Sequence, residues 1–174
     1  MNRYVGMGMF RRAARPDDGL DVPHPHAPAD ESRDVRVEPL NAAEAIWAAQ
    51  HREIVADLCG GSADAQTVSD LFDRVQAIWL QSDDRTDSAP LVHAFGVALG
   101  DLVAERVPGL SWASAHGQGQ PELVLSHPTH DLVIFPIGSV GKNWGHAPAG
   151  WLASHVHEAT GGALAILAGS RSPH

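Results

Sequence analysis

The chain has 174 residues, the usual size of a single domain. Hydrophobic residues make up 44% of it and charged residues 19%, a composition that excludes a wholly disordered chain. The 12 basic and 21 acidic side chains give a net charge of -9, which argues against nucleic acid or an anionic membrane as the partner. The single cysteine excludes an intramolecular disulfide, and no apolar run approaches the roughly 18 residues of a membrane-spanning helix.

The first 38 residues are predicted to form a disordered N-terminal tail. Three prolines fall within residues 22–29, and the flanking stretches are polar and lack apolar periodicity. Arg11 and Arg12 resemble a twin-arginine signal, but no apolar segment follows them, so we expect a cytoplasmic protein. The rich use of Arg, Ala, Gly and Pro with little Lys, Asn or Ile is typical of a GC-rich bacterial genome. The folded domain is expected to span residues 39–170, and a chain that begins at Val37 should keep its thermal midpoint.

Three helices are predicted after the tail. The first begins with a capping box of Asn41 and Glu44, carries apolar residues at helical spacing and ends at a glycine pair. The second follows the apolar spacing of residues 68–79, and the third follows that of residues 91–103. Two glycines stand four residues apart in the third helix, a spacing that lets another backbone approach closely.

The apolar period then changes to two, which predicts three short strands joined by tight connections. They cover residues 110–115, 122–126 and 132–137. Connections this short require antiparallel pairing. Residues 138–150 are predicted to form a glycine-rich loop and residues 151–160 a helix, while residues 163–168 fit either a fourth strand or a last helical turn. The fold class is therefore α+β, with N-terminal helices packed on a three- to four-stranded antiparallel meander and a C-terminal helix.

The eleven histidines raise the question of a metal site. His127, His130 and Asp131 surround one tight turn and offer two imidazoles and a carboxylate. A metal site usually takes further ligands from a rigid element. The candidates for that ligand are His116, His146, His155 and His157. Because histidine is commonly half-exposed without any ligand role, solvated turn and helix-surface histidines are favoured, and no metal or cofactor is predicted.

No catalytic residue is predicted either. Cys59 stands at the C-terminal end of the first helix, where the helix dipole disfavours the thiolate, so an inert thiol is favoured. Residues 138–143 read G-S-V-G-K-N, and both the glycine spacing and the residue after the lysine differ from those of a phosphate loop. The G-x-S-x-G motif of a serine hydrolase is not found in the sequence.

Residues 91–142 combine a helix with an F-G-x-A-L-G-like core, a Trp that opens the first strand, a hairpin, and a strand that ends in F-P before a basic residue. The positions that carry this pattern are Phe95, Gly96, Leu99, Gly100, Trp112, Phe135, Pro136 and Lys142. The pattern resembles a family of uncharacterised bacterial domains that bears a "domain of unknown function" label. The resemblance covers about a third of the chain. It implies an α+β fold in a bacterial cytosol and no known activity.

The missing catalytic signature favours a non-enzymatic binding or interaction module, whose partner is an unknown protein or a small ligand. The alternative is a metal-dependent hydrolase that uses the histidine-rich site. The expected partner surface is Lys142, Asn143, Trp144 and His146, because the chain's only lysine stands there beside a Trp in an otherwise acidic domain. A competing interpretation is that Trp144 folds back and plugs the open end of the sheet.

Overall fold

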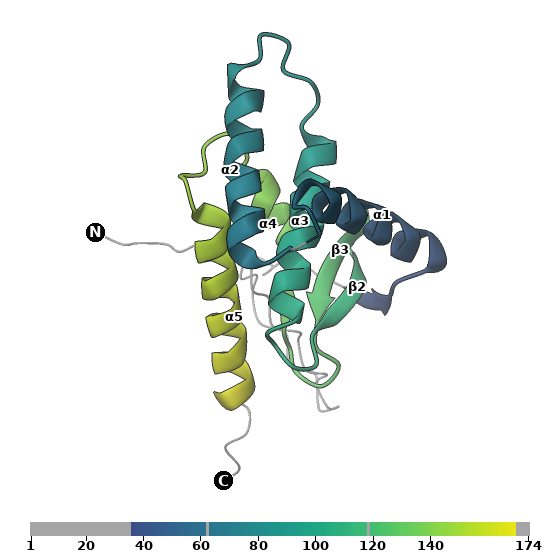
Figure 1. Cartoon of the computed structure of the whole chain (residues 1–174). Helices are drawn as coiled ribbons and strands as arrows, with labels where there is room; N and C mark the ends of the chain where they lie inside the picture. The colour runs from purple at the N-terminus through teal and green to yellow at the C-terminus, as the bar shows by residue number, and fades with distance from the viewer. Residues whose placement is uncertain (1–35, 62, 118, 170–174) are drawn as a thin grey trace, which may run out of the picture.

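The computed structural model describes residues 36–61, 63–117 and 119–169. Helices pack against a four-stranded antiparallel sheet, and the last helix lies beside α2 (Figure 1). This arrangement confirms the predicted α+β class. The elements in chain order are β1 (Arg36–Pro39), α1 (Ala42–Leu58), α2 (Ala65–Gln81), α3 (Ala89–Ala104), β2 (Ser111–His116), β3 (Glu122–Ser126), β4 (Val133–Ile134), α4 (Pro136–Asn143) and α5 (Trp151–Gly169).

The sheet has the strand order β1-β2-β3-β4, so the predicted meander of the last three strands is confirmed. Strand β1 was not predicted, and it pairs with β2 so that Val37 lies opposite Ala115. Its first three residues belong to the stretch predicted to be a tail, so the predicted boundary at residue 39 is too late and the folded part of the described chain includes Arg36. The rest of the predicted tail, residues 1–35, lies outside the described residues.

The predicted capping box at the start of α1 is confirmed. The Asn41 side chain accepts a hydrogen bond from the Glu44 backbone N–H at 2.9 Å, and the Asn41 N–H donates to the Glu44 carboxylate, also at 2.9 Å. The second oxygen of Glu44 accepts a hydrogen bond from the hydroxyl of Ser114 in β2. The cap therefore also joins α1 to the sheet.

Helix α3 lies at the centre of the core, and its two glycines are contact points. A Cβ atom at Gly96 would lie 2.6 Å from the Cα of Ile137 in α4, and one at Gly100 would overlap the Trp112 indole of β2. The predicted backbone approach is therefore confirmed at Gly96, whereas Gly100 makes room for a side chain. Trp112 belongs to the face of the sheet that packs on the helices.

One expectation for the C-terminal third is corrected, and one choice that the sequence left open is decided. The segment after the last strand is not one long loop, because α4 begins at Pro136, where a first-turn proline loses no hydrogen bond. The Glu122 carboxylate of β3 accepts a hydrogen bond from the Gly138 N–H in the first turn of α4. Residues 163–168 are helical rather than a strand, since α5 continues through its glycine pair. Buried Ala159, Ala163 and Leu167 supply the packing that offsets the low helix propensity of glycine.

Candidate functional site

The predicted partner surface is only partly at the surface. Trp144 is 8% exposed, and its ring lies 5.6 Å from that of Phe72 and 5.8 Å from that of Trp79, measured between centroids. Its indole is a core group, as the competing interpretation held, and is not available to a partner. Asn143 is half-buried, while Lys142 and His146 are exposed, and a binding role for these three residues stays a prediction.

Helix α2 holds the segment around Trp144 in place. The Gln76 side chain accepts a hydrogen bond from the Gly145 N–H at 2.9 Å and donates one to the Ala147 carbonyl at 3.0 Å. Asp73, one turn earlier, accepts a hydrogen bond from the Gly150 N–H at 2.8 Å. Side chains of α2 thus form hydrogen bonds with backbone groups of the connection between α4 and α5. These bonds hold the connection against the core.

The structure brings together only two of the histidines considered for a metal. The Nδ1 atoms of His127 and His130 lie 3.0 Å apart. Among residues 36–61, 63–117 and 119–169, no group of three or more His, Cys, Asp or Glu side chains is placed to hold a metal ion. The Nε2 atom of His116 instead lies 3.7 Å from the Glu38 carboxylate oxygen Oε2, and the His155 ring stacks on that of Trp151. The hydrolase alternative therefore has no ligand set in this part of the chain.

Cys59 gains no activation from its surroundings. Burial raises the pKa of its thiol, and the charge of Asp64 adds to the increase, while Arg74 opposes it. A higher pKa leaves less thiolate at neutral pH.

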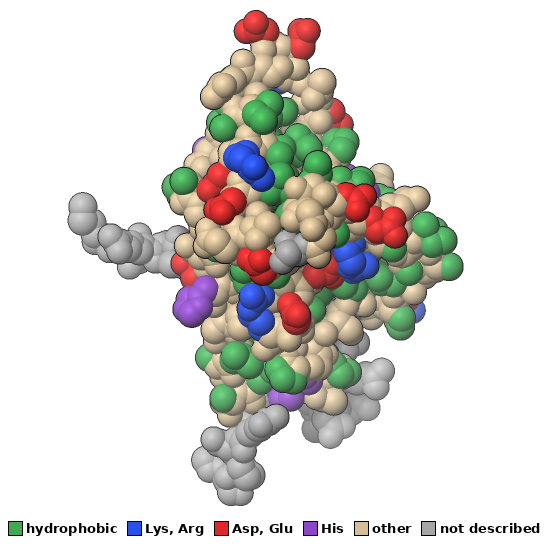
Figure 2. Space-filling view, viewed as in Figure 1, with side chains coloured by type: hydrophobic (Ala, Val, Ile, Leu, Met, Phe, Trp, Pro, Cys, Tyr) green, Lys and Arg blue, Asp and Glu red, His purple; other side chains and the backbone are tan. Residues whose placement is uncertain are grey.

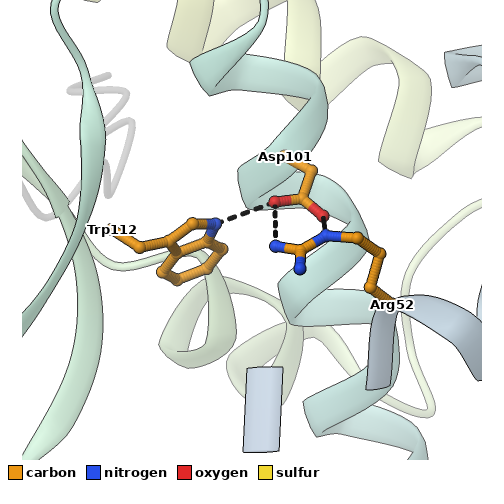
Figure 3. A network of polar contacts seen from close by, with 3 residues as sticks. All are labelled: Arg52, Asp101 and Trp112. Atoms are coloured by element: carbon orange, nitrogen blue, oxygen red, sulfur yellow. Dashed lines mark hydrogen bonds and ion pairs between the residues drawn. The ribbon is translucent and has the colours of Figure 1, made fainter. Parts of the chain in front are cut away.

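A polar network joins α1, α3 and β2 (Figure 3). Arg52 donates two hydrogen bonds to the Asp101 carboxylate, from Nε at 2.6 Å and from Nη2 at 2.9 Å, and the Trp112 indole N–H donates a third at 2.8 Å. The hydrogen bond with Asp101 raises the pKa of Arg52 against the opposing effect of burial. The guanidinium charge is thus already matched by a carboxylate.

A groove of about 320 Å³ opens beside this network, between α1 and α3. Its walls are mainly small or apolar, with three charged residues among them. The lining residues are Arg52, Val55, Ala56, Ala63, Ala98, Asp101, Leu102 and Glu105. Its size is at the lower limit of small-molecule pockets.

The largest departure from the sequence analysis is the outer face of α1. Ile46, Ile54 and Leu58 are 60%, 51% and 59% exposed, whereas Ala48 and Val55 are buried on the opposite side of the helix. At about 100° per residue, the three exposed side chains share an arc of roughly 120°. We call these three residues the α1 face. Figure 2 shows hydrophobic side chains gathered over α1 at the right of the molecule.

The surroundings of the α1 face are acidic. Glu53 and Asp57 are exposed on the same side of α1, each within about 20° of Ile46 around the helix axis. Arg52 is the one basic Lys or Arg residue in α1, and it forms an ion pair with Asp101. A partner that covers the α1 face therefore meets apolar groups flanked by exposed carboxylates.

Residues 71–153 match the family model described as Domain of unknown function (DUF3806). The match confirms the resemblance to a domain of unknown function. No curated protein and no solved structure matches the chain.

The DUF3806 segment runs from α2 to the start of α5. It contains Asp101 and Trp112, the close-packing glycines of α3, and the pair His127 and His130. Helix α1 lies outside it, so the α1 face is a feature of this chain that stands next to the DUF3806 segment. In the part of the chain that the structure describes, no helix is both long and apolar enough to cross a membrane.

Proposed function

We propose that this protein is a non-enzymatic interaction module that binds a basic, amphipathic helix of a partner protein on the α1 face. The observation that carries the proposal is the exposure of Ile46, Ile54 and Leu58 on one side of a helix whose other side is buried. Large apolar residues that gather on one surface with polar neighbours are typical of interaction sites. Burying one such side chain completely contributes about 1.5–3 kcal/mol, so three of them supply a useful affinity.

The charges on α1 favour a basic partner over a second copy of this chain. A symmetric contact through the α1 face would bring Glu53 and Asp57 of one copy close to the same carboxylates of the other. A partner helix with Lys or Arg beside its apolar stripe would instead place opposite charges there.

The remaining parts of the proposal come from the sequence. A net charge of -9 supports a protein partner over nucleic acid or an anionic membrane. A place in the bacterial cytoplasm stays a prediction from composition.

The test uses a synthetic amphipathic helix of leucine and lysine as the probe, with isothermal titration calorimetry on the full chain. The substitution Ile54→Gln removes one apolar side chain from the α1 face. It should weaken the binding of the probe helix by about tenfold, which corresponds to about 1.4 kcal/mol. Glutamine keeps the net charge and a good helix propensity, so the change isolates the apolar contact.

The matched control is Ile78→Gln on α2, because Ile78 is 69% exposed and lies outside the α1 face. It should leave the affinity for the probe within about twofold. The same helix with glutamate in place of lysine should bind more weakly than the lysine form, since it meets Glu53 and Asp57. Equal binding of both helices, or equal losses in both variants, would show that the α1 face is not the binding surface.

A further inference from the structure

The sequence that precedes β1 begins with a short segment that is both basic and apolar. Residues 1–15 contain four arginines and no Asp or Glu, whereas the chain as a whole has a net charge of -9. The same segment holds Phe10, the only tyrosine of the chain and all three of its methionines. Residues 1–15 therefore combine positive charge with large apolar side chains. The arginines are Arg3, Arg11, Arg12 and Arg15, and the methionines are Met1, Met7 and Met9.

The α1 face has the complementary character. Its three large apolar side chains are more than half exposed, and the carboxylates of Glu53 and Asp57 are exposed beside them. A guanidinium group forms charge-assisted hydrogen bonds with a carboxylate, and it keeps its charge at every physiological pH. Methionine side chains are unbranched and adapt to irregular apolar surfaces. The residue types of residues 1–15 thus match both parts of this surface.

The chain is long enough to bring this segment to the α1 face. Residues 16–35 connect it to β1, which ends at Pro39, and α1 begins at Ala42. These 20 residues span at most about 66–72 Å, whereas the 17 residues of α1 extend over about 26 Å. Because both partners belong to one chain, the effective concentration of the segment at the α1 face is on the order of 1 mM. A contact too weak to form between separate molecules is then populated.

We infer that residues 1–15 bind the α1 face of their own chain and compete there with the partner helix. The arginines of the segment pair with Glu53 and Asp57, and its methionines and Phe10 cover the apolar side chains. At a dissociation constant of about 1 mM the face is occupied in about half of the molecules, which weakens partner binding about twofold. The same occupancy raises the thermal midpoint by only about 1 °C, so a chain without residues 1–35 keeps nearly the midpoint of the full chain. The inference rests on the proposed function, because it places a competitor on the same surface.

The test uses the methyl groups of methionine as probes, since every methionine of the chain lies within residues 1–15. The full chain with isotope-labelled methionine methyl groups is measured by nuclear magnetic resonance, and a synthetic peptide of residues 1–15 gives the signals of the free segment. The signals of Met7 and Met9 in the full chain should differ from those of the peptide. They should move toward the peptide signals in Ile54→Gln and stay in place in Ile78→Gln, which is the matched control. Dilution by about tenfold should leave them unchanged, because the contact forms within one chain.

The charge contribution is tested by Glu53→Gln, which should move the methyl signals in the same direction as Ile54→Gln, with the exposed Glu158→Gln on α5 as the control. Methyl signals that coincide with those of the peptide, or that Ile54→Gln leaves unchanged, would overturn the inference. Signals that change on dilution would do the same, since they would report a contact between two copies.

The calorimetric titration with the leucine–lysine helix separates the two proposals. If Ile54→Gln weakens the binding of that helix while the methyl signals of the full chain match the free peptide, the proposed function stands and this inference alone fails. If the helix binds wild type and Ile54→Gln equally, the proposed function itself fails.

Discussion

Gly96 and Gly100 mark the places where α3 is approached most closely by other parts of the chain. At Gly96 the neighbour is the Cα of Ile137, which is backbone and cannot rotate away. At Gly100 the neighbours are the Trp112 indole and the ring of Pro136. The spacing of four in the sequence predicts that something packs here, because the two positions share one face of a helix. The identity of that neighbour depends on contacts distant in the sequence, which a local pattern does not contain.

The first prediction compares two glycine-to-alanine changes. Gly96→Ala should lower the free energy of unfolding by about 1–3 kcal/mol, the usual cost of inserting a methyl group into a full core. Gly161→Ala in α5 should raise it by about 0.4–1 kcal/mol, because alanine restricts the unfolded chain. A Cβ at Gly161 has no atom within 4 Å. Urea denaturation measures both, and changes of the same sign would contradict the close packing at Gly96.

At the scale of elements, the helices were predictable where the hydrophobic period is strong and less so elsewhere. Helix α2 has one clear apolar stripe, and it spans Ala65–Gln81 where residues 68–79 were predicted. Helix α4 contains Gly138 and Gly141, which local propensity disfavours. Its first turn is stabilised by Glu122, a residue of β3, and this long-range capping explains why the sequence analysis missed the helix.

The α1 face was missed for a related reason. Apolar residues occur on both sides of α1, and periodicity alone does not say which side α3 covers. The structure shows which side of α1 is covered, because Ala48 and Val55 are buried whereas Ile54 is exposed. An excess of large apolar residues around the full circumference of a helix is the signal that could have identified the face.

The second prediction concerns Trp144 as a core group joining α2, α3 and the connection after α4. Trp144→Ala should lower the free energy of unfolding by about 3–5 kcal/mol, the range for removing a large buried aromatic side chain. Its ring packs against Phe72, Phe95 and Trp79, so the change leaves a cavity. Lys142→Ala, two residues earlier and exposed, should change stability by at most about 0.5 kcal/mol. Thermal and urea unfolding of both variants measure the difference, and a small loss for Trp144→Ala would return it to the candidate surface.

At the scale of the whole molecule, the sheet is completed by a strand from the other end of the domain. Val37 of β1 lies opposite Ala115 of β2, so the two partners are separated by all three N-terminal helices. Strand β1 has four residues, and one of them is Pro39. A strand this short beside a proline-rich region gives almost no periodic signal, which explains why the sequence analysis assigned it to the tail. The three strands of the meander were predictable because short connections fix their neighbours.

The last prediction tests where the folded domain begins. A chain without residues 1–35 should keep the thermal midpoint of the full chain, since β1 is retained. A chain without residues 1–40 should lose at least about 1 kcal/mol of stability and unfold at least about 2 °C earlier, because 1 kcal/mol shifts the midpoint by about 2–4 °C in a protein of this size. The longer deletion removes the pairing with β2 and takes Val37 from the cluster of Ala113, Ala115 and Val124 on the outer face of the sheet. Differential scanning calorimetry separates the two chains. If the shorter deletion alone lowers the midpoint by as much, residues 1–35 contribute to stability and the predicted disordered tail is wrong.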